Sequence, residues 1–158
     1  MWTLPYYDAS AGNILMTSYA VPFTTAGKVS GVARIDLALQ DMFRTLGLPE
    51  KNGSMIVNGK GRYLYHTDSA LILNASLPTT DQYLPEDIGN LLAQMSLGDP
   101  GLVYLQRRDI DDKTWVAFAP IKSAGWYYLE TRSEKNRAGA CGRKTAAQQP
   151  DRNHGHHS

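Results

Sequence analysis

Aromatic residues and one carboxylate lie near the start of the chain, and their types suit recognition of a small charged molecule. The block W-x-x-P-Y-Y-D starts at Trp2 and contains Tyr6 and Tyr7; Tyr19 and Asp36 follow in β-prone segments. Phenol and indole rings offer flat apolar surface with a polar tip, and a carboxylate in a partly dry wall holds an ammonium group. These five residues therefore suit the binding of a small amine or zwitterion.

The same residues also have structural interpretations. Aromatic side chains are frequent in β-strands, and Asp36 stands where the N-cap of a following helix would lie. Arg34 shares one strand face with Asp36 and would form an ion pair that neutralises the carboxylate. Its guanidinium would equally serve as the partner of a ligand carboxylate. The residue types alone leave these alternatives open.

Composition and charge limit the class of protein. The chain has 158 residues, of which 42% are hydrophobic, enough for one domain with a core. Residues 1–132 carry 11 Lys and Arg against 13 Asp and Glu, so no basic face for nucleic acid is expected. The single cysteine, Cys141, allows neither an intrachain disulfide nor a cysteine-based zinc site. No cofactor, catalytic residue or metal site is predicted.

Three further segments contain residues that elsewhere carry out chemistry. His66, Asp68 and Ser69 would suit a hydrolase or a metal site, but the folded region has no second histidine, and a capped turn is the favoured interpretation. The acidic segment 109–113 lacks the spacing of a calcium loop and indicates a solvated hairpin tip. The run HGHH at 154–157 is assigned no biological site.

Hydrophobic periodicity predicts an α+β order in the first third of the chain. Strands are expected at 14–23 and 31–37, joined by the turn 24–28, with Pro22 marking the end of the first strand. The apolar spacing then changes to 3.6 residues, which predicts a short amphipathic helix from about Leu39 to Gly47.

The rest of the chain predicts a second sheet with the order β-β-α-β-β-β. A hairpin turns at Asn58-Gly59 within 54–66, and a helix begins at Pro85. Three strands are expected at 101–107, 114–121 and 126–131. This is an antiparallel sheet with flanking helices, as in PAS-like modules. From Ser133 onward no large apolar residue occurs, so 133–158 is predicted to be a disordered tail.

Three blocks in this order resemble the double-Cache family of extracytoplasmic sensor domains. They are W-x-x-P-Y-Y-D at 2–8, ILMTSYAVPF at 14–23 and GVARIDLAL at 31–39. Two later segments, MIVNGKGRYLYHTD at 55–68 and GWYYLETR at 125–132, are similar to the membrane-proximal module of that family. The resemblance covers most of residues 2–132.

The resemblance implies a division into modules. Residues 1–45 would be the C-terminal part of a membrane-distal Cache module, and residues 46–132 a PAS-like membrane-proximal module. In the family a long helix and further strands precede the first block, so we expect the chain to be a fragment that lacks half of the distal pocket. The incomplete distal sheet would expose strand edges that invite pairing with a second copy.

The resemblance also implies a function without catalysis. Family members lie outside the membrane, between the transmembrane helices of chemoreceptors, histidine kinases, cyclic-dinucleotide enzymes or phosphatases. Their amino-acid sites use a tyrosine of the P-Y-Y block and the aspartate of the G-V-x-x-x-D block. We therefore expect a sensing fragment of a membrane-bound bacterial signal-transduction receptor that works as a homodimer. The fragment would be extracytoplasmic, in the periplasm or the extracellular space, and would bind amino acids, amines or carboxylates. The expected ligand-binding residues are Trp2, Tyr6, Tyr7, Tyr19, Arg34 and Asp36.

In this interpretation the helix near Leu37 would pass a ligand-induced shift of the distal sheet to the proximal module. A dimerisation or interaction module that binds no ligand is the alternative, and a hydrolase around His66 is a third.

Overall fold

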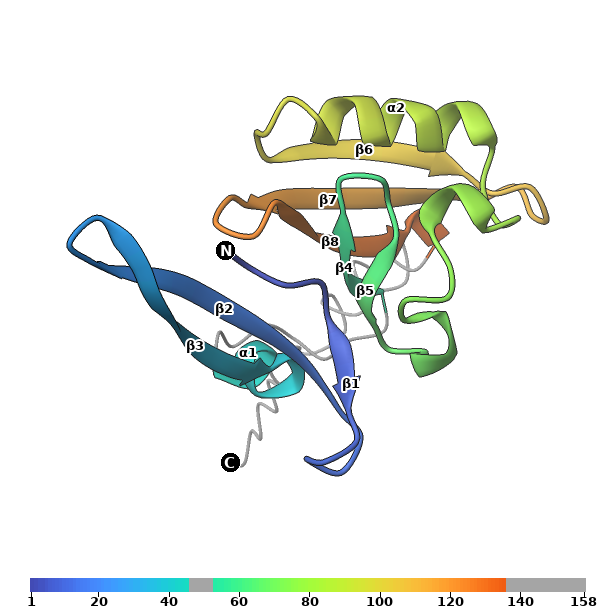
Figure 1. Cartoon of the computed structure of the whole chain (residues 1–158). Helices are drawn as coiled ribbons and strands as arrows, with labels where there is room; N and C mark the ends of the chain where they lie inside the picture. Colours follow the sequence, from blue (N-terminus) through green and yellow to red (C-terminus); the bar gives the residue numbers. More distant parts are fainter. Residues whose placement is uncertain (46–52, 136–158) are drawn as a thin grey trace, which may run out of the picture.

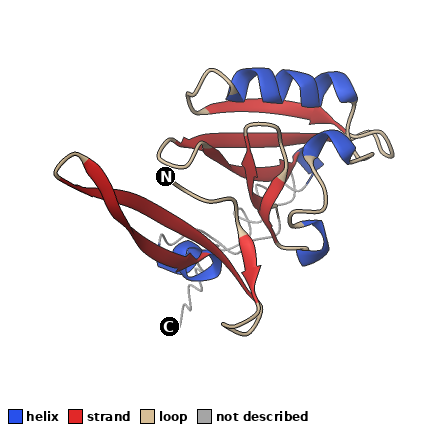
Figure 2. Cartoon of the chain, in the orientation of Figure 1, coloured by secondary structure: helices blue, strands red, loops and turns tan. Residues whose placement is uncertain are grey.

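The computed structural model describes residues 1–45 and 53–135, which form two antiparallel sheets (Figures 1 and 2). The first sheet has the order β1-β2-β3 and the second the order β5-β4-β8-β7-β6. The first sheet contains β1 (Tyr6–Asp8), β2 (Ile14–Thr25) and β3 (Lys28–Ala38). The second contains β4 (Ser54–Asn58), β5 (Tyr63–His66), β6 (Gly101–Gln106), β7 (Lys113–Ile121) and β8 (Trp126–Ser133). The helices are α1 (Leu39–Thr45), α2 (Pro85–Met95) and the 3-10 turns η1 (Ser69–Leu71) and η2 (Leu77–Thr79).

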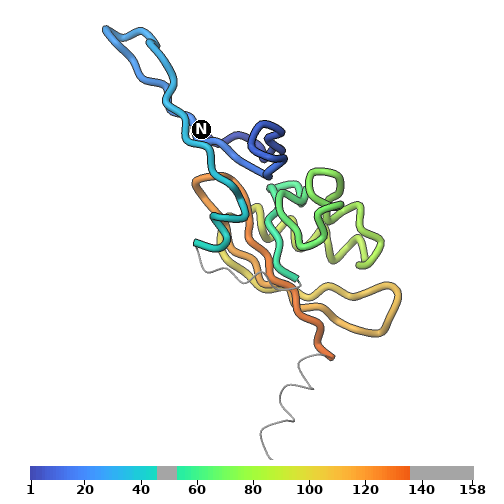
Figure 3. Tube along the Cα trace, turned by 90° about the horizontal axis from the view of Figure 1, so that it is seen from below, coloured from blue at the N-terminus to red at the C-terminus, as the bar shows by residue number. Residues whose placement is uncertain are grey.

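Strands β2 and β3 form a long hairpin whose tip extends away from the second sheet (Figures 1 and 3). The turn lies at Ala26 and Gly27, which have φ angles of 50° and 77°. Positive φ at both central residues is the geometry of a type I′ turn, whose twist matches that of the flanking strands. The hairpin predicted from the sequence is therefore present.

The prediction that β2 ends at Pro22 is wrong, because β2 continues to Thr25 and Pro22 pairs with Val32. The backbone of β2 explains why proline is tolerated there. The amide of Ala20 donates to the carbonyl of Met1, so even-numbered residues of β2 point their amides away from β3. Pro22 thus lacks an N–H only on the side where no described strand follows, and no ladder hydrogen bond is lost.

The short helix α1 connects the two sheets through its buried side. Leu39 and Phe43 are each 1% exposed and pack with Ile56, Leu64 and Trp126 of the second sheet. The ring of Phe43 stacks on that of Tyr65, with centroids 3.9 Å apart. A helix of seven residues is marginal alone, so this burial stabilises α1 in its position.

Helix α2 covers the other face of the second sheet (Figure 1). Its buried residues Ile88, Leu91 and Met95 pack against strand residues that include Val116 and Leu129. Pro85 stands in its first turn, as predicted. Among the described residues, no helix has the length and hydropathy needed to span a membrane.

The predicted α+β class and the order β-β-α-β-β-β are confirmed. Strand β8 extends two residues beyond its predicted end at Thr131, because Ser133 pairs with Thr114 and its hydroxyl donates to Asp112. The predicted start of the disordered tail at residue 133 is therefore wrong, because Ser133 belongs to β8. The predicted module boundary near residue 46 and the part of the predicted tail from residue 136 onward lie outside the described residues.

The α1 contact predicts a large effect of truncating Phe43. We expect Phe43→Ala to lower the free energy of unfolding by about 3–5 kcal/mol, because a buried phenylalanine leaves a cavity in a close-packed cluster. Urea denaturation of the purified chain measures this change. Phe23→Ala is the matched control: Phe23 is 53% exposed, and its truncation should cost about 1 kcal/mol or less. Equal costs for the two variants would contradict the role assigned to α1.

Candidate ligand-binding site

The six residues predicted to bind a ligand lie on both faces of the first sheet. Register pairs Ser18 with Asp36 and Ala20 with Arg34, so these side chains share one face, named here the Asp36 face; Tyr6 lies there too, opposite Met16. Trp2, Tyr7 and Tyr19 lie on the opposite face, named the Tyr19 face. The structure therefore brings together only three of the six.

A continuous chain of polar contacts crosses all three strands on the Asp36 face. The hydroxyls of Tyr6 and Ser18 are 2.9 Å apart, and the Ser18 hydroxyl donates to Asp36 Oδ1 at 2.5 Å. Arg34 donates from Nη2 to Asp36 Oδ2 at 3.0 Å, and its Nε lies 3.0 Å from Oδ1. Ser18 is 1% exposed, whereas the Asp36 side chain is 34% exposed. The buried hydroxyl of Ser18 thus holds a carboxylate that still faces solvent.

These contacts decide between the structural interpretations of Asp36. Asp36 lies inside β3, three residues before α1 begins at Leu39, so the N-cap alternative is wrong. The ion pair with Arg34 is present. Because the Arg34 side chain is 61% exposed, water screens this pair and weakens it.

An open hollow of about 360 Å³ adjoins Asp36 where β3 passes into α1. Leu37, Ala38 and Met42 supply apolar wall, and Asp41 and Thr45 supply polar groups. Asp41 pairs with Arg44 at 3.0 Å, and both side chains are largely exposed. The hollow combines a small apolar wall with two carboxylates, which suits an ammonium group on a short aliphatic side chain.

On the Tyr19 face, Trp2 packs between the two sheets, whereas Tyr7 and Tyr19 are 42% and 39% exposed. The rings of Trp2 and Tyr19 lie 5.0 Å apart, and Trp2 lies 6.2 Å from Trp126 of β8. The indole Nε1 of Trp2 is buried without a hydrogen-bond partner among the described residues. Tyr7 also lies on this face, opposite Leu15. Trp2, Tyr7 and Tyr19 therefore lie apart from the polar contacts of Asp36.

Residues that the sequence analysis did not single out complete the arrangement. Ser18 connects Tyr6 to Asp36, and Asp41, Met42 and Thr45 line the hollow. Ser18 could have been found from the alternation of ILMTSYAVPF, once the register of the hairpin was known. The α1 residues gave no signal, because their positions depend on the direction in which α1 leaves the sheet.

The segment with His66 forms a capped turn, as the sequence favoured. The Asp68 amide donates to His66 Nδ1 at 2.9 Å, and Asp68 Oδ1 accepts from the amide of Ala70 at the start of η1. Burial lowers the pKa of His66.

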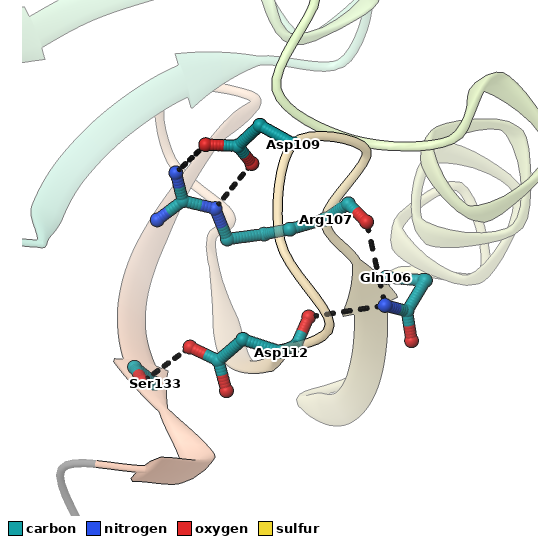
Figure 4. A network of polar contacts seen from close by, with 5 residues as sticks. All are labelled: Gln106, Arg107, Asp109, Asp112 and Ser133. Atoms are coloured by element: carbon teal, nitrogen blue, oxygen red, sulfur yellow. Dashed lines mark hydrogen bonds and ion pairs between the residues drawn. The ribbon is translucent and has the colours of Figure 1, made fainter.

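The acidic hairpin tip between β6 and β7 is tied by ion pairing and hydrogen bonds (Figure 4). Two guanidinium nitrogens of Arg107, Nε and Nη2, donate to the two carboxylate oxygens of Asp109. The side-chain amide of Gln106 donates to the backbone carbonyl of Asp112. Residues 108–111 are exposed, as expected of a solvated tip, whereas Asp112 accepts from the Ser133 hydroxyl at 2.6 Å and is 6% exposed. Among the described residues, no three His, Cys, Asp or Glu side chains are grouped to hold a metal ion.

Comparison with known proteins connects this arrangement to receptors. Residues 1–44 match the family described as methyl-accepting chemotaxis protein-like, first PDC sensor domain. No curated protein matches the chain.

Solved structures share the fold across both sheets. The extracellular domain of soHK1S-Z6, assigned to a histidine kinase, gives a TM-score of 0.67 at 24% identity over 89% of this chain and 51% of that domain. The ligand-binding domain of the Pseudomonas fluorescens chemoreceptor CtaA, solved with L-isoleucine, gives 0.60 at 28% identity over 89% and 54%. That of the Pseudomonas aeruginosa PAO1 amino acid chemoreceptor PctC, solved with GABA, gives 0.57 at 23% identity over 83% and 54%.

The fold and these similarities define an extracytoplasmic sensing domain of the receptor type. Within that class, residues 1–44 are similar to the PDC sensor family, and the PAS-like fold expected from the resemblance is confirmed. The chain spans about half the length of the solved domains that it matches, 51% and 54% for the first two described.

The Ser133 contact predicts the titration of Asp112. The hydrogen bond from Ser133 lowers the pKa of Asp112, so the contact stabilises the fold above the ordinary aspartate pKa and is lost as the pH falls through the lowered value. We expect Ser133→Ala to raise the pKa of Asp112 toward 3.8 and to reduce the stability lost between about pH 5 and pH 2.

NMR titration of the side-chain carboxyl carbons measures the pKa of Asp112 in the wild type and in Ser133→Ala. Asp8 is the internal control, because the Ser10 side chain, rather than Ser133, is the main cause of its lowered pKa. An Asp112 pKa that stays unchanged in Ser133→Ala would rule out this contact in solution.

Proposed function

We propose that this chain is the non-catalytic sensing part of a membrane-bound bacterial signalling receptor, and that it recognises an amino-acid-like zwitterion through Asp36 and Arg34. The observation that carries the proposal is the solvent-facing Asp36–Arg34 pair beside an open hollow. A ligand with an ammonium and a carboxylate group would replace one exposed ion pair with two, one to each side chain.

Preorganisation of Asp36 supports this role. Ser18 is buried and donates to the Asp36 carboxylate, and Tyr6 contacts Ser18 from the neighbouring strand. A carboxylate already held in place loses little conformational entropy when it binds a ligand. Oδ2 remains available for an ammonium group once Arg34 turns toward a ligand carboxylate.

The ligands of similar structures have the chemistry that this site would need. CtaA was solved with L-isoleucine and PctC with GABA. Both ligands carry one ammonium and one carboxylate group, although they differ in the distance between the two. The hollow beside Asp36, with Leu37, Ala38 and Met42 in its wall, would take the aliphatic part.

The strand–helix junction provides a route for the signal. β3 ends at Ala38 and α1 begins at Leu39, so no loop separates the binding face from the helix that packs on the second sheet. A ligand that binds one position of β3 more tightly would shift the population of α1 positions. We further propose that the parent protein carries transmembrane helices and works as a homodimer.

An interaction module without a ligand is the second candidate, and the exposed apolar surface of the hairpin favours it. Val21, Phe23, Val29, Val32 and Ile35 are 46–68% exposed. Surface of this kind is typical of contacts with another chain. A stable dimer with no ligand response in the titrations below would support this candidate in place of sensing.

The sensing proposal predicts a ligand response that depends on Asp36. Titration of the ¹⁵N-labelled chain with L-isoleucine and with GABA should shift the amide signals of Ser18, Asp36 and Leu37. We expect Asp36→Asn to weaken binding at least about tenfold, because a charge-assisted hydrogen bond is lost. Asp109→Asn is the matched control, since Asp109 pairs with Arg107 far along the chain. Equal affinity of Asp36→Asn and wild type would remove Asp36 from the site.

The two halves of the ligand can be tested separately. n-Butylamine lacks the carboxylate and butyrate lacks the ammonium group. We expect Asp36→Asn to abolish the response to n-butylamine, and Arg34→Gln to abolish the response to butyrate, as read from the same amide signals. A response to both probes that neither variant changes would place the ligand elsewhere.

A further inference from the structure

Leu73 lies between η1 and η2 and has a left-handed backbone, with a φ angle of 62°. This conformation brings Cβ close to the following carbonyl oxygen, so residues with large side chains rarely adopt it. Asn13 and Ala26, the other described non-glycine residues with positive φ, lie in the turns that join β1 to β2 and β2 to β3. A residue strained in this way persists only where its surroundings hold it.

Both backbone groups of Leu73 are held by the residues at the start of β5. The amide of Leu73 donates to the carbonyl of Tyr63 at 2.8 Å. The carbonyl of Leu73 accepts from Nε of Arg62 at 3.0 Å and also from Nη2 of the same guanidinium. Two hydrogen bonds from one charged donor fix the direction of this carbonyl. Because Arg62 is exposed, water can compete for the guanidinium, and this contact can open without disturbing the core.

The held conformation of Leu73 directs its side chain to α1. Leu73 packs against the buried cluster that contains Leu39 and Phe43 of α1. On β5, Tyr65 stacks on Phe43 in the same region. The strained residue therefore adds its side chain to the contacts that keep α1 against the second sheet.

We propose that Arg62 and Leu73 form a latch that keeps α1 in its described position, and that release of this latch gives the second state of the receptor. The inference rests on the proposed function, because it names the regulation of the candidate site. In the released state Arg62 leaves the carbonyl of Leu73, and Leu73 turns to negative φ and withdraws its side chain from the cluster. Relief of the strained backbone offsets part of the packing that is lost.

The ligand would favour the latched state. The hollow beside Asp36 is lined by Asp41, Met42 and Thr45 of α1, so its wall is complete only while α1 stays in this position. A ligand that binds one of two states lowers the population of the other by mass action. Loss of the ligand would therefore raise the released population, and this is the change that the receptor would report.

Amide hydrogen exchange, measured by NMR on the ligand-free chain, tests the latch. We expect Arg62→Met to speed exchange of the Leu73 and Phe43 amides about tenfold, because the guanidinium no longer holds the Leu73 carbonyl. The amides of α2 should keep their rates, since α2 packs in the other cluster. Arg132→Met is the matched control, because it removes an exposed guanidinium that pairs with Glu130. Unchanged rates in Arg62→Met, or equal changes in Arg132→Met, would overturn the latch.

A Leu73→Gly background tests the contribution of backbone strain. Glycine adopts positive φ without the steric cost, so this variant has no strain to release. Within this background we expect Arg62→Met to change the exchange rate of the amide at position 73 by less than about twofold. An acceleration as large as in the chain with the native leucine would contradict release driven by strain.

L-Isoleucine tests the connection between the latch and the candidate site. At about ten times its dissociation constant it should slow exchange of the Leu73 amide about tenfold, because it binds the latched state alone. Faster exchange in Arg62→Met, with no amide response to L-isoleucine or GABA, would support the latch and contradict the ligand proposal. Shifts of the Ser18 and Asp36 amides on titration, with unchanged exchange at Leu73, would support the ligand proposal and overturn the latch as the second state.

Discussion

The packing of Leu39 and Phe43 into the apolar cluster of the second sheet is the contact on which the arrangement depends. α1 has seven residues and would not persist in water without it. Because β3 passes into α1 without a loop, burial of these two side chains also sets the position of the last residues of β3. Asp36 is three residues from Leu39, so the candidate site takes its place from a core contact rather than from the sheet alone.

The first sheet uses its two faces differently. The Tyr19 face packs toward the second sheet: Trp2 contacts Trp126, and Leu15 packs against the cluster that contains Leu39 and Phe43 of α1. The Asp36 face carries the polar contacts, and its Arg34 and Asp36 side chains are accessible to solvent. Strict alternation along a strand makes this possible, because each residue placed for packing leaves its neighbours free for recognition. The solved relatives with bound amino acids share this fold.

Much of the fold could be predicted, because its signals are local. Asn58-Gly59 marked a hairpin, and the apolar spacing after Pro85 marked α2. The candidate site was harder to predict than the fold. Six residues were predicted to bind together, yet alternation in the hairpin separates Trp2, Tyr7 and Tyr19 from Asp36. Pairing across strands decides which side chains meet, and one sequence gives no register between β1 and β2. The end of β2 was predicted wrongly at Pro22 for a related reason. Only the direction of the hydrogen bonds of β2 shows that the missing N–H of Pro22 faces no partner. The division into two modules remains a prediction.

The sharing of core residues between the sheets bears on how such a domain can be cut. The fully buried apolar residues of the first 45 positions, Leu39 and Phe43, have their buried partners, Ile56, Leu64 and Trp126, in strands that follow residue 53. The segment matched by the sensor family ends at residue 44 and thus carries the candidate site without a hydrophobic nucleus of its own. The boundary of the segment that matches the family and the boundary of a buried core therefore differ in this chain. Recombination at residue 44 would transplant the block but leave behind the side chains that keep it folded.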